Sequence, residues 1–176
     1  MEFTKYQKLG SYHWKMYDDP NTKYRRHADR VKDWVEEKTV LDVGCGDGKI
    51  TDMLGAIGID DDREGIKLAL EKHVPCMVGD AYNIEFGDNS FDAVFMGDVL
   101  EHMEFPKKCL KEARRVLRKY LYVVTPIPGM QNDPFHYFEP TSEELKELVE
   151  KQGFVLEGEI LVVPRDKRLY GKFKKV

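Results

Sequence analysis

At 176 residues, the chain is long enough to form one domain whose hydrophobic core needs no disulfides or structural metals. Its charged residues, 34% of the total, are of mixed sign and leave a formal net charge of −4, which gives no general case for nucleic-acid binding. Three separated cysteines without a CxxC pair argue against a disulfide framework or zinc site, and no stretch approaches the ~18 apolar residues of a membrane span. We therefore expect a single cytoplasmic domain, 1–176, that does not insert into a membrane.

The first 24 residues are rich in aromatic side chains. Tyr6, Tyr12, Trp14 and Tyr17 fall here without the alternation of a strand. The segment fits either a helix that packs its aromatic side chains on the core or a lid over a cleft, and the sequence leaves both open. From Pro20 to about residue 37, apolar residues recur at steps of three or four, which predicts an amphipathic helix.

Apolar runs typical of buried strands alternate with helical patterns along the rest of the chain. The predicted strands span residues 39–43, 56–60, 76–78, 91–96, 120–125 and 154–163, followed by a short one at 169–173. The predicted helices span residues 49–54, 63–72, 106–117 and 142–152, the last beginning at the capping box 141–144. This alternation predicts an α/β fold: a doubly wound, mostly parallel, seven-stranded Rossmann-like sheet with helices on both faces and short or irregular last strands.

Glycines, carboxylates and a histidine follow four of the predicted strands. Residues 44–48 read Gly-Cys-Gly-Asp-Gly after the first strand, Asp60 and Asp80 come at the ends of the next two, and residues 97–102 follow the fourth. Ligands in doubly wound sheets bind beyond the carboxyl ends of the strands, where the strand order reverses. We therefore predict that these four positions form one cofactor site, in which the glycine loop lets a ligand approach the backbone.

A dinucleotide is the first alternative for this cofactor. Its fingerprint, G-x-G-x-x-G, holds a pyrophosphate at the start of a helix. Here the spacing is G-x-G-x-G, with Lys49 where the third glycine should stand and Asp47 inside the loop. Because a carboxylate would repel pyrophosphate, the sequence argues against nicotinamide and flavin dinucleotides.

The motif VLDVGCGDG at 40–48 resembles the first motif of the class I S-adenosylmethionine-dependent methyltransferases, and the chain looks like a small, single-domain, type 11-like member. The resemblance covers about residues 25–163. It continues through Gly58-Ile59-Asp60, Val78-Gly79-Asp80-Ala81, FDAVFMGDVLEHME at 91–104, KEARRVLRKYLYVVTP at 111–126 and EPTSEELKELVEKQGF at 139–154. The chain departs from the family pattern in the short helix after the glycine loop and at 118–120, where Arg-Lys-Tyr replaces the usual Pro-Gly-Gly.

The resemblance implies S-adenosyl-L-methionine as the cofactor and S-adenosyl-L-homocysteine as its product. It implies that Asp42 attracts the cofactor's ammonium group. Asp60 offers two acceptor oxygens to the two ribose hydroxyls, while Asp80 and the backbone of Ala81 suit the adenine. The expected cofactor-binding residues are Asp42, Gly44, Cys45, Gly46, Gly48, Asp60, Asp61, Asp80, Ala81, Gly97 and Asp98.

Methyl transfer is an in-line displacement that needs a general base only when the acceptor holds a proton with a high pKa. The candidate catalytic residues are Asp98, His102 and His136. Many relatives carry the pair Glu101-His102 at this point, where it caps or packs a helix, so a structural role stays open. With Glu101 and Glu139, these residues also resemble the metal-binding set of small-RNA 3′-terminal ribose methyltransferases and of some quinone O-methyltransferases. We nevertheless expect a metal-free site.

The resemblance implies an enzyme that methylates O or N of a small or medium-sized acceptor. The alternatives are an RNA-modifying methyltransferase, metal-assisted at a ribose hydroxyl, and a non-catalytic S-adenosylmethionine-binding regulatory subunit. The basic run at 165–176 is either a solvated tail or a grip on an anionic substrate, so nucleic acid stays possible without being favoured. The acceptor site must come from residues 1–24, the loop 126–140 or a partner subunit, and either a monomer or a homodimer fits.

Overall fold

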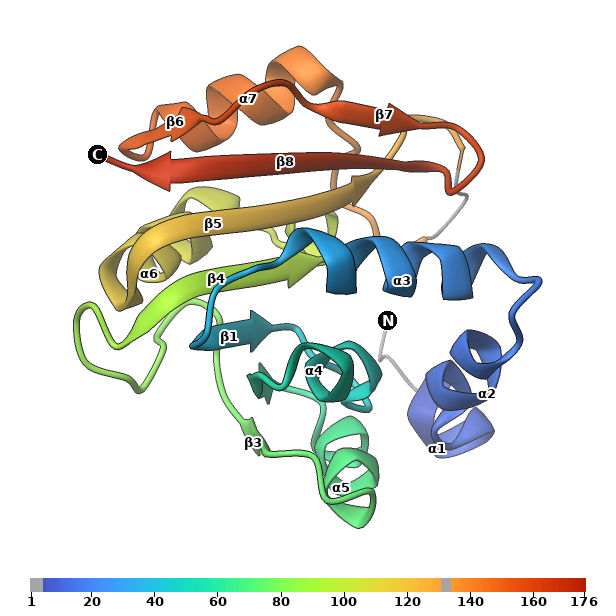
Figure 1. The fold of residues 1–176 in the computed structure, drawn as a ribbon. Coiled ribbons are helices and arrows are strands. Elements are labelled where there is room, and N and C mark those ends of the chain that lie inside the picture. Colours follow the sequence, from blue (N-terminus) through green and yellow to red (C-terminus); the bar gives the residue numbers. More distant parts are fainter. Residues whose placement is uncertain (1–4, 131–133) are drawn as a thin grey trace.

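An open sheet of eight strands forms the centre of the computed structural model, which describes residues 5–130 and 134–176 (Figure 1). The strands are β1 (Val40–Val43), β2 (Ile57–Asp60), β3 (Cys76–Val78), β4 (Phe91–Gly97), β5 (Leu117–Pro126), β6 (Phe154–Leu156), β7 (Leu161–Val163) and β8 (Arg168–Lys175). Their order is β3-β2-β1-β4-β5-β8-β6, and β7 also pairs with β8. Strands β1 to β5 pair in parallel, whereas β8 runs antiparallel to its neighbours. The predicted mostly parallel α/β sheet is confirmed, with eight strands in place of seven.

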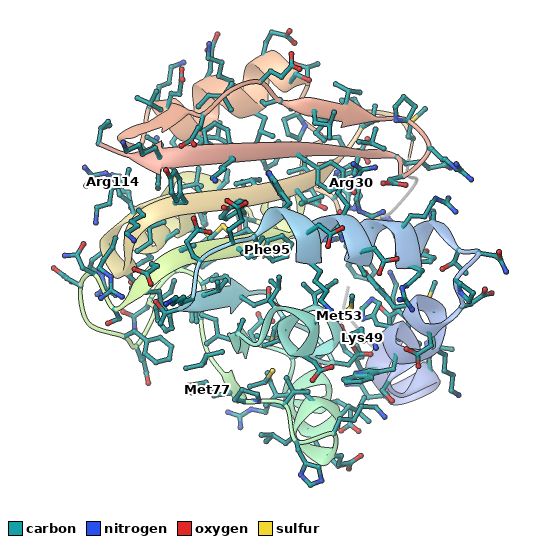
Figure 2. All side chains as sticks on the ribbon, viewed as in Figure 1. Arg30, Lys49, Met53, Met77, Phe95 and Arg114 are labelled. Atoms are coloured by element: carbon teal, nitrogen blue, oxygen red, sulfur yellow. The ribbon has the colours of Figure 1, made fainter. Side chains whose placement is uncertain are left out.

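Helices cover both faces of this sheet. They are α1 (Lys5–Leu9), α2 (Tyr12–Asp18), α3 (Lys23–Trp34), α4 (Lys49–Leu54), α5 (Arg63–Glu71), α6 (Pro106–Val116) and α7 (Ser142–Glu150), with a 3-10 turn η1 (Leu100–His102). Figure 1 shows α3 and α4 on one face and α6 and α7 on the other. Because successive strand residues point to opposite faces, Phe95 packs under α3 (Figure 2) while its neighbour Met96 packs with α6.

Most predicted elements lie within about three residues of their observed bounds, and two of the differences have a clear local cause. The helix expected from Pro20 begins at Lys23 because the Thr22 side chain caps it, accepting a hydrogen bond from the backbone N–H of Arg25. The single strand predicted at 154–163 is two short strands, β6 and β7. Gly158, with φ of +80°, breaks the extended chain between them.

Residues 168–175 form an eight-residue strand, so the solvated-tail interpretation of the basic run at 165–176 is wrong for this part. β8 pairs with β5 from Tyr120↔Lys174 to Pro126↔Arg168. The side chains of Arg168 and Phe173 are buried. Arg168, Lys172, Lys174 and Lys175 of this run therefore belong to a strand inside the sheet, whereas Arg165 and Lys167 precede it.

The strand order reverses at β1, which lies between β2 and β4. Figure 1 shows α1 and α2 on the side of the sheet toward which β1 and β4 point, where doubly wound sheets bind ligands. The proposed lid at 1–24 therefore lies near the predicted site, although residues 1–4 of it fall outside the described part of the chain. Among residues 5–130 and 134–176, no helix has both the length and the apolar character needed to cross a bilayer.

Candidate active site

The loop after β1 holds three glycines in the left-handed backbone region. The φ angles of Gly44, Gly46 and Gly48 are +76°, +54° and +77°. A Cβ at Gly44 would lie 2.4 Å from Val99 Cγ2, and a Cβ at Gly46 would lie 2.0 Å from the hydroxyl of Tyr6. The loop thus requires glycine both for its turn and for the close approach of neighbouring groups.

Asp42 is a buried carboxylate on β1, with 2% of its surface exposed. The hydroxyl of Thr51 on α4 donates to its Oδ2 at 2.6 Å. Burial raises the pKa of Asp42 to about 7, because a charge removed from water is disfavoured. A cation placed beside this carboxylate would stabilise its ionised form, as the predicted contact with an ammonium group requires.

Asp60 joins the end of β2 to the glycine loop. Its Oδ2 accepts the backbone N–H of Gly46, and its Oδ1 accepts that of Asp62, each at 2.8 Å. Burial raises the pKa of Asp60 to about 6. Because each carboxylate oxygen has two lone pairs, Asp60 can still accept hydrogen bonds from ligand hydroxyls.

The connection after β3 supplies the third predicted carboxylate. Oδ1 of Asp80 accepts the backbone N–H of Tyr82 at 2.7 Å, which forms a tight turn around Ala81. Asp80, Ala81 and Asp61 line the same cavity as the glycine loop. The acidic ends of β2 and β3 therefore meet the glycine loop in one place, as predicted.

Asp47 fastens the N-terminal helices to the glycine loop. Its side chain, fully buried, accepts the backbone N–H of His13 at 3.1 Å and lies 3.1 Å from His13 Nδ1. The indole N–H of Trp14 donates to the carbonyl oxygen of Asp47 at 2.9 Å, and Lys49 lies over the ring of Trp14. We call these contacts of Asp47 with His13 and Trp14 the N-terminal clasp. It holds α2 against the candidate cofactor site.

Asp98, just beyond β4, is paired with Arg168 of β8. Arg168 Nε lies 2.9 Å from Asp98 Oδ2, and a terminal nitrogen lies 2.5 Å from the same oxygen. Burial raises the pKa of Asp98, but the guanidinium of Arg168 outweighs this effect and holds the pKa below its usual range. The arrangement makes Asp98 a fixed anion rather than a proton acceptor.

Two histidines and one glutamate gather beside Asp98. Nδ1 of His102 lies 3.2 Å from the carbonyl oxygen of Phe135, and Nδ1 of His136 lies 2.7 Å from Glu139 Oε1. The rings of His102 and His136 are 4.8 Å apart. Glu101, 1% exposed, directs its Oε2 to a place where no described residue forms a hydrogen bond with it, and burial raises its pKa. We call Glu101, His102 and His136 the polar cluster.

One cavity of about 870 Å³ is lined by most of these groups. One wall holds the glycine loop and the carboxylates of β1, β2 and β3. Another holds Asp98 and the polar cluster. The N-terminal segment supplies aromatic side chains, among them Tyr6, Tyr12, Tyr17 and Tyr24.

The cavity brings together every predicted site residue except one. Gly48 does not line it: a Cβ there would lie 2.9 Å from Ala69 Cβ, so this glycine lets the loop pack on α5. The side chain of Cys45 belongs to the apolar cluster under α5, and its backbone N–H donates to the carbonyl oxygen of Ile59. The cavity walls also include the N-terminal aromatic residues expected of a lid.

Sequence reasoning missed Arg168 and the partners of Asp47. Arg168 lies in a run of basic residues, and nothing in that run distinguishes the buried arginine from the exposed lysines. The sequence indicates only that Asp47 would repel phosphate, whereas its hydrogen-bond partners lie 33 and 34 residues away along the chain. The only signal in the sequence was the glycine at position 46, which indicates that a neighbouring group approaches the loop closely.

Comparisons with known proteins agree with this geometry. The model of a family described as a methyltransferase domain matches residues 41–124. A probable S-adenosylmethionine-dependent methyltransferase of Mycolicibacterium smegmatis is 30% identical over 158 residues, covering 79% of this chain and 62% of the relative. Demethylmenaquinone methyltransferase of Thermotoga maritima is 29% identical over 108 residues, covering 56% of this chain and 47% of the relative. The chain thus spans 62% and 47% of the lengths of these two curated relatives.

A solved structure gives the same fold. The crystal structure of an S-adenosylmethionine-dependent methyltransferase from Thermotoga maritima, described as a possible histamine N-methyltransferase, matches with a TM-score of 0.79 at 20% identity. The match covers 97% of this chain and 98% of that one. Residues 41–124, just under half of the chain, match the methyltransferase-domain family, and the chain has the fold of class I methyltransferases.

The residues of the cavity fit the family's cofactor, S-adenosylmethionine. Gly44 is exposed on the cavity wall, and the Cβ that it lacks would collide with Val99. The buried carboxylate of Asp42 suits a cationic amino group, and Asp60 retains lone pairs for two hydroxyls. Neither feature would suit a pyrophosphate.

Proposed function

We propose that this protein transfers a methyl group from S-adenosylmethionine to an oxygen or nitrogen of a small or medium-sized acceptor. The observation that carries the proposal is the single cavity of about 870 Å³, which has a cofactor wall on one side and the polar cluster on the other. A donor and an acceptor can therefore lie in one enclosure, as in-line displacement requires.

The cavity wall formed by the glycine loop and the carboxylates of β1, β2 and β3, which we call the cofactor wall, binds and orients the cofactor. We propose that Asp42 faces the ammonium group, that the backbone of the loop from Gly44 to Gly46 follows the amino acid, and that Asp60 accepts the ribose hydroxyls. Asp80 and Ala81 then hold the adenine. When bound, the cofactor supplies a methyl carbon already activated by a positive sulfur, so the protein's main tasks are alignment and exclusion of water.

The cavity wall formed by Asp98 and the polar cluster, which we call the acceptor wall, removes the proton of the acceptor's reacting group. Of the three predicted catalytic residues, Asp98 is the least suited to act as a base, because Arg168 lowers its pKa. We propose that Asp98 instead shapes the cavity through its ion pair, and that the acceptor's reacting group lies at His102 and His136. Aromatic side chains of α1 and α2 would cover an acceptor of modest size.

Two alternatives are less well supported. An RNA substrate would need a basic approach to the cavity, but much of the basic run at 165–176 is part of β8, and its buried arginine, Arg168, is paired with Asp98. A non-catalytic binding protein would need no acceptor wall. The presence of the polar cluster in the same cavity as the cofactor wall favours an enzyme.

Transfer of a labelled methyl group tests the proposal. Purified protein is incubated with S-adenosylmethionine labelled in its methyl group and with small-molecule, RNA and protein fractions of the source cell. We expect label in the small-molecule fraction, and Asp60→Ala should abolish it. Label confined to RNA or protein would contradict the proposed acceptor class, and absence of label from every fraction would contradict the proposed activity.

A further inference from the structure

The polar cluster presents the donor atoms of a metal site. One ligand atom from each of Glu101, His102 and His136 lies within 4.8 Å of the others. Two imidazoles and one carboxylate form the protein ligand set of catalytic zinc sites and of the facial triads that bind other divalent transition metals. Such three-ligand sites leave positions open for a substrate.

The hydrogen bonds of the two imidazoles determine where their lone pairs lie. The carbonyl oxygen of Phe135 can only accept, so Nδ1 of His102 must carry a proton and its lone pair must be on Nε2. Nδ1 of His136 faces Glu139 Oε1 at 2.7 Å, and Glu139 is in turn held by the backbone N–H of Gly129 at 2.7 Å. A histidine that donates its other ring N–H to a carboxylate or carbonyl is the usual arrangement around a protein-bound metal.

Glu101 provides a second, independent observation. Its side chain is 1% exposed, and its Oε2 accepts no hydrogen bond from any described residue. Burying a carboxylate oxygen without a partner is costly, so such an oxygen calls for an explanation. A cation bound between Glu101 and the two imidazoles would supply the missing partner.

The other carboxylates near the polar cluster already have partners. Asp98 is bound by Arg168, and Glu139 accepts from His136 and Gly129. These contacts leave Glu101 as the carboxylate of the cluster that can ligate directly. Ligand atoms about 2.1 Å from a tetrahedral zinc ion stand about 3.4 Å apart, so side-chain shifts of roughly an ångström would close the site.

Although the sequence alone predicts a metal-free site, we propose that Glu101, His102 and His136 bind one divalent transition-metal cation, such as Zn²⁺ or Mn²⁺, which takes an acceptor hydroxyl as a further ligand. This role rests on the proposed function and makes the acceptor an alcohol or phenol. Ligation lowers the pKa of the hydroxyl. Its O–H bond breaks and the proton leaves to solvent; the oxygen's electron pair then bonds to the methyl carbon, and the electrons of the broken C–S bond stay on sulfur.

Two titrations of the metal-free full chain test the site. Binding of Mn²⁺ is measured from the electron paramagnetic resonance signal of the free ion, and binding of Zn²⁺ is measured by calorimetry. The test variants are Glu101→Gln, which keeps the volume of a neutral glutamic acid, and His136→Asn, which keeps a donor toward Glu139. The matched control is His73→Asn. His73 is exposed in the turn after α5 with φ of +61°, a conformation that asparagine tolerates.

We expect one metal ion per wild-type and control chain. Loss of an outer partner typically weakens metal binding by about 10- to 100-fold, and loss of a ligand in either test variant should weaken it at least as much. Wild-type protein that binds neither ion at millimolar concentration, or test variants that bind like the control, would overturn the proposal. S-adenosylhomocysteine binding measured on the same samples separates the two proposals: cofactor binding without metal binding contradicts the metal site alone, whereas metal binding without methyl transfer contradicts the proposed function.

Discussion

Arg168 holds the carboxylate of Asp98 at the cavity wall, although the two residues are 70 positions apart. The guanidinium side chain is 5% exposed, and its Nε lies 3.0 and 2.9 Å from the two carboxylate oxygens. The pair joins the start of β8 to the turn after β4, where Asp98 has φ of +54°. The C-terminal strand therefore contributes directly to the geometry of the candidate active site.

Replacing one residue of this ion pair should destabilise the protein more than replacing both. Asp98→Asn leaves the buried guanidinium of Arg168 without a counter-charge, and Arg168→Gln leaves the carboxylate unpaired; each should cost about 3 kcal/mol. In the double variant neither charge remains, so its loss in the free energy of unfolding should be clearly smaller than the sum. Urea unfolding of the four proteins measures this, and additive losses would contradict the pairing.

The N-terminal clasp gives a second prediction. Asp47→Ala removes the acceptor of the His13 backbone N–H and should release α1 and α2, at a cost of about 1–3 kcal/mol. Limited proteolysis should then cut the chain before residue 23 much faster than in wild type. Asp52→Ala is the matched control, because Asp52 is exposed on α4 and its side chain has no hydrogen bond among those seen in the described residues. Equal cleavage of both variants would mean that Asp47 does not hold the segment.

Alanine substitutions at Gly46 and Gly55 distinguish the effect of a steric clash from that of backbone strain. Gly46 and Gly55 have φ of +54° and +60°, but a Cβ at Gly46 would lie 2.0 Å from the Tyr6 hydroxyl whereas one at Gly55 would meet nothing within 4 Å. Gly55→Ala should therefore cost about 1 kcal/mol in stability and leave cofactor affinity unchanged. Gly46→Ala should displace Tyr6 and lower S-adenosylhomocysteine affinity by at least tenfold by calorimetry. Equal affinities in the two variants would contradict the position of the loop.

Cofactor affinity should depend on pH through the buried carboxylates. Burial raises the pKa of Asp42 to about 7 and that of Asp60 to about 6, so both are largely protonated at pH 5 in the free protein. Ionised carboxylates are needed for the ammonium and ribose contacts. Affinity for S-adenosylhomocysteine should therefore fall by roughly tenfold or more from pH 8 to pH 5.5. A flat profile across this range would contradict the roles of both residues.

The raised pKa of Asp42 also predicts how the stability of the ligand-free protein changes with pH. Because the folded-state pKa of Asp42 lies above its ordinary value of 3.8, its contribution to stability is fully present below about pH 4 and is lost as the pH rises through about 7. Asp42→Asn removes this loss, so the ligand-free variant should be more stable than wild type at pH 8 by about 1–4 kcal/mol. Thermal unfolding at pH 4 and pH 8 checks it. A variant less stable than wild type at pH 8 would contradict the burial of an uncompensated charge.

Local patterns in the sequence predicted the frame of the site well. The apolar run before Gly44 and the glycine spacing after it determine a buried strand and a tight turn, because both depend on residues within a few positions. The same holds for the carboxylates at Asp60 and Asp80, which follow from where their strands end. Parallel strands bring these ends together, so one cavity could be foreseen.

The contacts that close the site could not be predicted, because they join distant segments. Arg168 resembles its basic neighbours in the sequence, and only the pairing of β8 with β5 brings it to Asp98. The docking of α2 on Asp47 likewise depends on tertiary packing. For residues 154–163, the sequence prediction joined two apolar runs across Glu157-Gly158-Glu159 into one strand, whereas the positive φ of Gly158 separates two strands.

Titration of the full chain with S-adenosylhomocysteine by calorimetry tests the central claim most directly. The cavity that joins Asp42, the glycine loop and Asp60 predicts saturable binding of one molecule per chain. Asp60→Ala should weaken this binding by at least tenfold. Absence of any binding heat at millimolar ligand, over a range of temperatures, would contradict the assignment of this cavity as a cofactor site.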